Sequence, residues 1–263
     1  MSKNILDEIV ANTRREVEDR QNKVTLNFLK EQIVIGERDS SFVDAILNPS
    51  DVDVAIIGEI KLAAPSVGEL ATEQEVVPTA VSYQGAGVDA ISVITDHKYF
   101  KGDIEFIQRV KNHVSAPILQ KDFVVDEYQI YEAVQAGSNA ILLIARIVDA
   151  PTLQKFVGTC AELGIEPIVE IYDDLDVEKT AASGARVIAV NARNLTTFEV
   201  DIDNACGLLE QLDEDFIKLG FSGVSARSDV EKYSGAGARG VLVGTSLMKA
   251  VDIKSYISEL KGI

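Results

Sequence analysis

Short apolar runs recur along this chain and alternate with segments whose apolar residues have helical spacing. The first clear run spans residues 54–61; it ends in Glu59 and Lys61 and is broken at Pro65. Apolar runs of this length, flanked by turn residues, are typical of strands buried on both faces of a parallel sheet. Seven later runs repeat the arrangement, which predicts eight parallel strands joined by helices. The predicted strands span residues 54–61, 90–95, 117–122, 140–145, 167–171, 187–191, 217–221 and 240–244.

A glycine recurs at the junction between a predicted helix and the next strand. The junction glycines are Gly87, Gly137, Gly184 and Gly237, and the interval between each of them and the next fits two strand–helix units. Glycine adopts the left-handed conformation at a helix end at little cost and turns the chain into the following strand. No glycine-rich nucleotide loop follows the first strand, which disfavours an open doubly wound sheet. The pattern predicts an α/β fold, a closed (β/α)8 TIM barrel, as a single domain over residues 1–263.

The first 50 residues precede the barrel and are predicted to form an N-terminal helical extension. Residues 3–23 carry Ile5, Ile9 and Val17 among many charges, which is typical of an amphipathic helix. A second helix is predicted over residues 39–47. These helices are expected to lie across a barrel end, either as a structural plug or as part of a substrate lid.

The charge balance narrows the class of partner. The chain has 42 acidic and 25 basic residues, a formal net charge of -17. This charge argues against nucleic acid, because phosphate backbones require clustered lysine and arginine. A phosphorylated small molecule would also be repelled by the global field, so its binding would rely on local cations and backbone amides. The sequence leaves the oligomeric state open, and a monomer is compatible with it.

The sequence predicts no membrane segment, secretion signal or metal site. No apolar run approaches the roughly 20 residues that a membrane-spanning helix needs. The acidic start lacks the basic and apolar blocks of a secretory signal, so we expect no membrane partner and a cytoplasmic location. Two cysteines, Cys160 and Cys206, each lie in a predicted helix with apolar neighbours, so neither a disulfide framework nor a metal site is expected of them. Neither His97 nor His113 stands near a second plausible ligand, so no zinc site is expected.

Polar residues stand at the carboxyl ends of the predicted strands. In a barrel these ends meet at one face, where barrel enzymes place their chemistry. An ion-pair network that tightens the rim is the structural alternative, because ionised residues at buried strand ends need a partner or a use. The residues that this argument brings together are Glu59, Lys61, Thr95, Lys121, Glu170, Asn191 and Arg193.

The last two strands are followed by small residues. Ser222 and Gly223 follow the seventh strand, and Gly244, Thr245 and Ser246 follow the eighth. Small residues let backbone amides approach an anion, and a helix that begins after Gly244 would direct its positive end to the same place. The loops after strands seven and eight are a frequent phosphate site in such barrels, so a phosphorylated substrate is expected.

Several of these motifs resemble indole-3-glycerol phosphate synthase of tryptophan biosynthesis, over nearly the whole chain. The Lys-Asp-Phe block at 121–123 and the Thr-Asp-x-x-Tyr-Phe-x-Gly block at 95–102 are the most specific. The others are Glu59-Ile-Lys61-Leu-Ala-Ala-Pro65-Ser66, Leu142-Leu-Ile-Ala-Arg, Val169-Glu170, Val190-Asn191-Ala-Arg193-Asn-Leu195 and Val243-Gly-Thr-Ser-Leu-Met. The resemblance implies a carboxy-lyase, which closes the indole ring of 1-(2-carboxyphenylamino)-1-deoxyribulose 5-phosphate with loss of carbon dioxide and water. It implies no organic cofactor and no metal.

The resemblance also implies roles for individual residues. Lys121 would protonate the ketone and Glu170 would act as the base, while Lys61 would be a second acid or a partner of the substrate's anionic groups. Which lysine acts in which step stays open. Glu59 and Asn191 would orient these groups, and Arg193 would hold Glu59 or an anion. The remaining substrate-binding residues are Ser66, Ser222, Gly223, Gly244, Thr245 and Ser246, together with Phe100, Phe123 and Leu195, which would form either a wall for the aromatic ring or plain core.

The chain departs from the family pattern near the same rim. Phe221 stands where the family usually has glutamate, and a phenyl ring accepts no hydrogen bond and carries no charge. Leu62, Ala64 and Val67 stand where the family tends to have a basic residue, serine and a basic residue. Three explanations fit these changes. They are sequence drift around an active site that still works, a lowered synthase activity or altered substrate choice, and deliberate redesign of a natural barrel.

Two other classes of function compete with the synthase. One is a different phosphate-binding barrel enzyme, such as a sugar-phosphate isomerase or a tryptophan synthase α subunit, neither of which would need both Lys61 and Lys121. The other is a catalytically silent barrel that binds a phosphorylated metabolite or a partner protein, which Phe221 favours.

Overall fold

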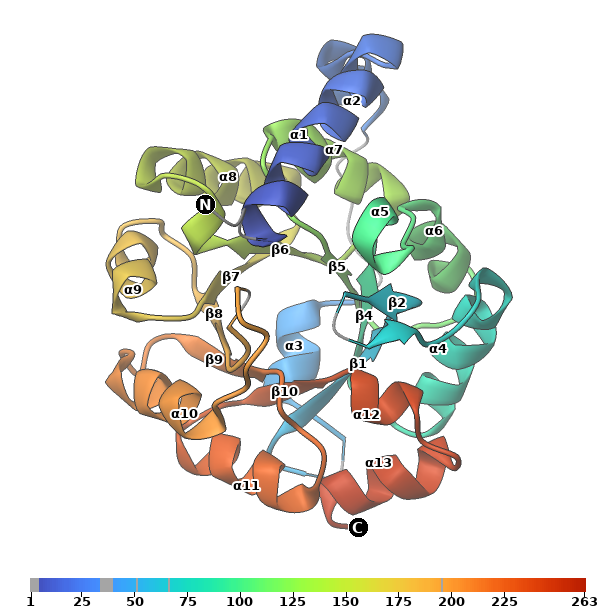
Figure 1. Cartoon of the computed structure of the whole chain (residues 1–263), viewed down its shortest axis with the longest axis vertical. Coiled ribbons are helices and arrows are strands. Elements are labelled where there is room, and N and C mark those ends of the chain that lie inside the picture. Colours follow the sequence, from blue (N-terminus) through green and yellow to red (C-terminus); the bar gives the residue numbers. More distant parts are fainter. Residues whose placement is uncertain (1–4, 34–39, 51, 66, 195) are drawn as a thin grey trace.

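The computed structural model describes residues 5–33, 40–50, 52–65, 67–194 and 196–263. Its parallel strands close into a barrel in the order β1-β10-β9-β8-β7-β6-β5-β4 (Figure 1). The barrel strands are β1 (Ala55–Ile60), β4 (Ala90–Ile94), β5 (Ile118–Lys121), β6 (Ala140–Ile144), β7 (Glu166–Ile171), β8 (Val187–Asn191), β9 (Ile217–Phe221) and β10 (Gly240–Val243). Each coincides with a predicted apolar run to within one residue or two, so the predicted (β/α)8 barrel is confirmed.

Helices surround the barrel (Figure 1). The longer ones are α4 (Val76–Gly85), α6 (Glu105–Lys111), α7 (Glu127–Ala136), α8 (Ala150–Leu163), α9 (Asp174–Ala181), α10 (Ile202–Gln211), α11 (Arg227–Gly235) and α13 (Ile253–Lys261). Shorter pieces lie in the connections: β2 (Ala63–Ala64), β3 (Gly68–Glu69), η1 (Glu73–Glu75), α5 (His97–Phe100), η2 (Ala145–Ile147) and α12 (Thr245–Met248). Among the described residues, no helix combines the length and the apolar character that crossing a membrane would require.

The four junction glycines have the backbone conformation that their position predicts. Gly87, Gly137, Gly184 and Gly237 have φ values of 87°, 91°, 82° and 89°. Side chains other than glycine rarely adopt this left-handed region. These glycines therefore turn each helix end into the next strand without the steric cost of a Cβ atom.

Alternation along each strand separates two apolar layers. Ile56 of β1 packs with the helices in the outer layer, whereas its neighbour Ile57 points into the barrel. Leu119 of β5 and Leu219 of β9 also belong to the inner layer. Because the interior is filled with side chains, only the ends of the barrel are open to ligands.

The N-terminal extension contacts both ends of the barrel. It comprises α1 (Ile5–Lys23), α2 (Leu26–Gln32) and α3 (Phe42–Leu47). The buried residues of α3 join Ala55 and Ala90 in the inner layer, at the amino ends of β1 and β4, so α3 plugs that end.

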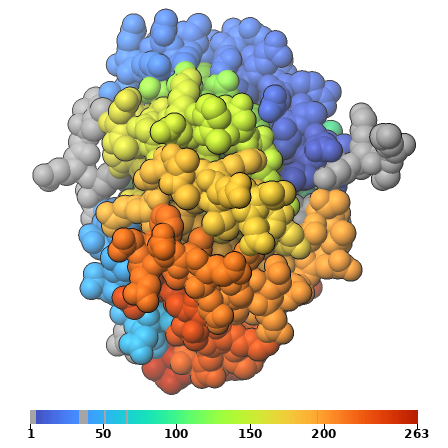
Figure 2. Space-filling model, turned by 90° about the vertical axis from the view of Figure 1, so that its left-hand side faces the viewer, coloured from blue at the N-terminus to red at the C-terminus, as the bar shows by residue number. Residues whose placement is uncertain are grey.

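Helix α1 lies at the other end. Its Asn12 accepts a hydrogen bond from Lys98 of α5, and Arg20 forms a two-pronged ion pair with Glu132 of α7, at 2.8 and 3.0 Å. Figure 2 shows α1 and α2 at one end of the long axis of the molecule and the C-terminal residues at the other end of that axis. The extension thus divides: one part is a plug and another lies beside the carboxyl end of the barrel.

The predicted helices of the extension agree with the structure only in part. The described part of the 3–23 helix matches α1, and residues 3 and 4 lie outside the described residues. The second helix begins at Phe42, whereas residue 39, where it was predicted to begin, also lies outside them. Helix α2 was not predicted, because seven residues that follow the cap Thr25 form too short a segment to show helical periodicity.

Gly58 in β1 provides a test of the packing between strand and helix. A Cβ atom on Gly58 would lie 2.6 Å from Cδ2 of the buried Tyr83, so we expect Gly58→Ala to reduce the free energy of unfolding by about 1–3 kcal/mol. Gly158, in α8, is the matched control because a Cβ atom there meets nothing within 4 Å. Gly158→Ala should increase stability by about 0.5–1 kcal/mol. Urea unfolding midpoints measure both effects, and equal midpoints for the two variants would contradict the packing described.

Candidate active site

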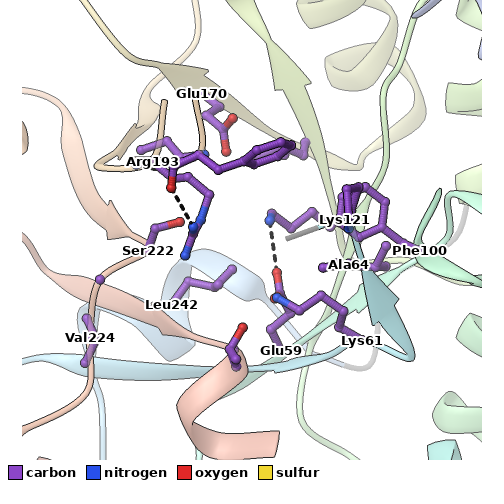
Figure 3. Close-up of a pocket in the computed structure, with 18 of the residues that line it drawn as sticks. Glu59, Lys61, Ala64, Phe100, Lys121, Glu170, Arg193, Ser222, Val224 and Leu242 are labelled. Atoms are coloured by element: carbon purple, nitrogen blue, oxygen red, sulfur yellow. Dashed lines mark hydrogen bonds and ion pairs between the residues drawn. The ribbon is translucent and has the colours of Figure 1, made fainter. Parts of the chain in front are cut away.

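A cavity of about 360 Å³ opens at the carboxyl ends of the barrel strands (Figure 3). The structure brings thirteen of the fifteen predicted site residues to its lining: Glu59, Lys61, Phe100, Lys121, Phe123, Glu170, Asn191, Arg193, Ser222, Gly223, Gly244, Thr245 and Ser246. The other two, Ser66 and Leu195, lie outside the described residues. Residues from all over the sequence therefore share one chamber, as expected for polar strand ends in a closed barrel.

A buried carboxylate holds two lysines at one side of this cavity. Glu59 is 2% exposed, and its two oxygens lie 2.7 Å from Nζ of Lys61 and 2.9 Å from Nζ of Lys121 (Figure 3). Burial alone would raise the pKa of Glu59, but the charges and hydrogen bonds of Lys121 and Lys61 outweigh it and lower the pKa to about 2. Gly244 leaves room for this group, because a Cβ atom there would lie 2.3 Å from Oε1 of Glu59.

Lys121 lies where carboxylates face it from two strands. Burial would lower the pKa of its ammonium group, but the charges of Glu59 and Glu170 outweigh burial and raise the pKa above its ordinary value. Lys121 is therefore protonated at neutral pH. Because its side chain remains 22% exposed at the cavity, the ammonium group can donate a proton to a bound molecule.

Glu170 occupies a different electrostatic environment from Glu59. It is 4% exposed, and burial raises its pKa despite the charge of Lys121 and a hydrogen bond from Asn191. Among the described residues, its Oε2 atom has no hydrogen-bond partner. A buried carboxylate oxygen without a partner is costly unless a ligand supplies a donor, so Glu170 is suited to accept a proton.

Asn191 and Arg193 are held by the loop after β8. The Oδ1 atom of Asn191 accepts a 3.0 Å hydrogen bond from the backbone N–H of Arg193. The guanidinium of Arg193 donates from Nη1 to the carbonyl oxygen of Phe198 at 3.0 Å (Figure 3). Arg193 was expected to hold either Glu59 or an anion, and it is the two lysines that donate charge-assisted hydrogen bonds to Glu59. The cavity thus has a third cation whose remaining donors can face an anion.

Two aromatic rings form part of the apolar lining of the cavity. The rings of Phe100 and Phe123 are 6.1 Å apart between centroids and tilted by 35°. Both line the cavity and also pack with the inner apolar layer, so they serve as wall and core together. The other apolar residues of the lining are Ala64, Pro65, Ile94, Leu142, Ile144, Phe198, Val224 and Leu242. A flat aromatic group would bury apolar surface against the two rings.

The loops after β9 and β10 form the small-residue end of the cavity. Ser222 and Gly223 have φ values of 68° and 84°, and Gly244 is followed by α12, as predicted. The hydroxyl of Ser246 donates to the carbonyl of Val224 at 2.8 Å, which ties the two loops together. Exposed amides of such loops are a common way to bind an anion.

Comparison with known proteins shows the family to which this chain belongs. The family model described as indole-3-glycerol phosphate synthase matches residues 6–260. The chain is similar to indole-3-glycerol phosphate synthase from Ruminiclostridium cellulolyticum, with 35% identity over 98% of this chain and 99% of that one. It is also similar to the synthase from Leuconostoc mesenteroides, with 36% identity over 98% and 99%. The chain belongs to the indole-3-glycerol phosphate synthase family.

More distant solved structures share the fold of this family. A 3-hexulose-6-phosphate synthase has a TM-score of 0.64 and 15% identity over 80% of this chain and 99% of its own. A mutant tryptophan synthase α subunit from Pyrococcus furiosus has a TM-score of 0.62 and 17% identity over 81% and 99%. At this level of identity the likeness shows the barrel alone.

The positions where the chain departs from the synthase pattern differ in how they meet the cavity. Phe221 is 1% exposed and packs in the inner apolar layer, directly before Ser222. Ala64 lines the cavity, Leu62 packs in the outer layer and Val67 is exposed. The apolar change at Phe221 therefore lies inside the barrel, below the chamber, whereas only Ala64 among these four lines it.

Sequence reasoning missed some residues of the lining. Phe198 lines the cavity with a φ of 62°, a rare conformation for a bulky residue that no sequence pattern signals. Asp122 also lines it and accepts a 2.6 Å hydrogen bond from Thr95. Its place after Lys121 at a strand end was a usable signal, because neighbouring residues at a strand end stay near the rim.

Asp96 supports the aromatic wall and makes stability depend on pH. Its side chain caps α5 by accepting from the backbone N–H groups of Tyr99 and Phe100, at 2.7 and 3.0 Å. Burial, together with the nearby charge of Asp122, raises the pKa of Asp96 to about 6. A raised pKa means that the folded protein binds this proton more tightly than the unfolded chain does. The contribution of Asp96 to stability is therefore greatest at low pH and falls as pH rises from about 4 to about 6.

We expect Asp96→Asn to stabilise the protein at pH 7.5 by about 1–3 kcal/mol and to change little at pH 4.5, since asparagine keeps the cap without the buried charge. Asp149→Asn is the control, because Asp149 caps α8 in exposed surroundings and its hydrogen bonds to Thr152 lower its pKa. That variant should show no gain at pH 7.5. Urea midpoints at both pH values test this, and an equal gain from Asp96→Asn at both would contradict it.

Proposed function

We propose that this protein is an indole-3-glycerol phosphate synthase. It converts 1-(2-carboxyphenylamino)-1-deoxyribulose 5-phosphate into indole-3-glycerol phosphate, carbon dioxide and water. Family membership over nearly the whole chain supports this reaction. The observation that carries the proposal is the single cavity in which Lys61, Lys121 and Glu170 face a space between an aromatic wall and two small-residue loops.

Binding places the substrate along the length of the cavity. Its phosphate lies at the loops after β9 and β10, where Ser222, Gly223, Gly244, Thr245 and Ser246 line the chamber. Its aminobenzoate ring lies against the rings of Phe100 and Phe123. This arrangement brings the ketone carbon and the aromatic carbon together beside Lys121, and holding two reacting atoms in place supplies much of the rate enhancement.

The first chemical step forms the new carbon–carbon bond. The aromatic carbon that bears the carboxylate attacks the ketone carbon, and Lys121 donates its proton to the ketone oxygen, which becomes a hydroxyl group. The carboxylate then leaves as carbon dioxide, and its bonding electron pair restores the aromatic ring. Glu59 anchors Lys121 during this transfer through their 2.9 Å contact.

The second step removes water. The new hydroxyl group leaves with a proton from an ammonium group, and Glu170 takes a proton from the ring being formed, which creates the double bond of the indole. The acid in this step is either Lys61 or Lys121 after it has regained from water the proton that it gave in the first step, and the assignment between them stays open. Asn191 orients Glu170, while Arg193 binds an anionic group of the substrate. Ser66 and Leu195 complete the proposed substrate-binding set. These transfers need only acids, a base and orientation, so no cofactor is proposed.

Turnover and its dependence on Glu170 test the proposal. Purified protein incubated with the deoxyribulose phosphate should develop indole fluorescence, and Glu170→Gln should lower kcat by about 10²- to 10⁴-fold because amide cannot act as the base. Glu166→Gln is the matched control: Glu166 begins the same strand, β7, at its opposite end, and its loss should leave the rate unchanged. An absence of fluorescence after long incubation would reject the synthase and favour a silent metabolite-binding barrel.

A substitution at Phe221 tests whether the carboxylate that the family usually has at this position is needed for the full rate. Phe221 ends β9 and its side chain faces the barrel interior, so a glutamate there would lie just below the cavity. We expect Phe221→Glu to raise the rate about tenfold while it lowers stability, since the carboxylate must leave water. Phe221→Leu, which adds no charge, should not raise the rate. A rate for the folded glutamate variant that is unchanged or lower would reject this role.

A further inference from the structure

Tyr233 lies behind the loop that we assign to phosphate. It belongs to α11, is 0% exposed, and packs directly on β9, where a Cβ atom on Gly220 would lie 2.3 Å from its Cδ1. Its hydroxyl oxygen lies 3.2 Å from the carbonyl oxygen of Phe221 and 3.0 Å from that of Ser222. The single hydroxyl proton is thus shared between two successive carbonyls at the end of β9.

One of these hydrogen bonds fixes the direction of the following amide. In a planar trans peptide, the C=O of one residue points opposite to the N–H of the next. The carbonyl of Ser222 points to the buried Tyr233, so the N–H of Gly223 points away from it. Because Gly223 lines the cavity, this N–H can face an anion that binds there. The carbonyl of Phe221 also accepts a 2.9 Å hydrogen bond from the N–H of Ala192, so the N–H of Ser222 lies on the side of β10, where Phe221 pairs with Leu242.

The backbone that presents this amide is strained. Ser222 has a φ of 68°, which costs free energy for a residue with a Cβ atom. Gly223 has a φ of 84°, and a Cβ atom there would lie 2.7 Å from Cγ1 of Ile202, so only glycine fits. A strained conformation persists where its surroundings hold it, and Tyr233 is bonded to both peptides concerned.

We propose that Tyr233 is a positioning residue, which holds the Gly223 amide towards the cavity so that it binds the substrate's phosphate group. The inference rests on the proposed function, because it deepens the assignment of the phosphate end. Tyr233 touches no substrate and acts through the backbone that it holds. Burial raises the pKa of its hydroxyl, so the group stays a proton donor at the pH at which the enzyme would be assayed.

Tyr128 offers a matched control, because it shares the chemistry of Tyr233 but lies elsewhere. It is 2% exposed, and its hydroxyl donates to the carbonyl oxygen of Val24 at 3.0 Å, between α7 and the N-terminal extension. Tyr128→Phe and Tyr233→Phe each remove one buried hydroxyl and keep the ring. A purely structural role for Tyr233 predicts the same consequences for both variants.

The experiment compares the affinity of the full chain and both variants for inorganic phosphate by calorimetry, and then KM and kcat with the deoxyribulose phosphate. We expect Tyr233→Phe to weaken phosphate binding and to raise KM by about tenfold each, the effect of about one misdirected hydrogen bond, with a smaller change in kcat. Tyr128→Phe should bind phosphate as the wild type does. Equal phosphate affinity of Tyr233→Phe and the wild type would overturn the proposal.

A second measurement needs no variant, so it holds even if Tyr233→Phe does not fold. The amide proton and nitrogen shifts of Gly223 should move on addition of phosphate to the wild type, and unmoved shifts at saturation would overturn the proposal. Failure of this inference can be distinguished from failure of the proposed function. A protein that turns over substrate while Tyr233→Phe binds phosphate normally keeps the proposed function and loses this inference. A protein that binds phosphate through this amide without turnover keeps the inference and loses the synthase.

Discussion

The cavity depends on one buried interaction, the carboxylate of Glu59 between the ammonium groups of Lys61 and Lys121. Removing an ion from water is costly, and this trio offsets the cost by pairing each oxygen with its own lysine. The arrangement leaves a net positive charge at the rim of a protein whose formal net charge is -17. A local cationic site within an acidic molecule can attract a doubly charged phosphate only at short range, where screening is weak. Loss of Glu59 would leave the two ammonium groups without the carboxylate that both of them contact.

The pKa values of two carboxylates in this cavity are shifted in opposite directions by their surroundings. Glu59 has two lysines and a lowered pKa, whereas burial dominates at Glu170 and raises its pKa. One carboxylate therefore serves as a fixed counter-charge and the other as a proton acceptor, although both stand at strand ends of the same barrel. The polar residues that line the chamber suit a sugar phosphate, and its aromatic and aliphatic residues suit an aromatic ring. The amphipathic character of the cavity matches the two ends of the substrate proposed for it.

The strands and the rim could be read from the sequence because both follow from local chemistry. Apolar runs, junction glycines and polar strand ends are each properties of a few adjacent residues, and a closed barrel then leaves only one face for the polar ends. Features that depend on tertiary packing could not be read in this way. Helix α2 is seven residues long, and the division of the extension between both barrel ends depends on contacts with distant strands. The left-handed conformation of Phe198 likewise depends on its surrounding loop and not on its residue type.

The division of the N-terminal extension has a consequence for how the chain acquires its structure during synthesis. Arg20 of α1 pairs with Glu132, 112 residues further along, and α3 packs on strands that follow it. The apolar side chains of Leu6 and Ile9 emerge from the ribosome before the inner layer that will cover them exists. Contacts between distant residues form slowly, because the intervening chain must first be ordered. Leu6 and Ile9 are thus made before the barrel strands that cover them and are secured only after those strands have formed.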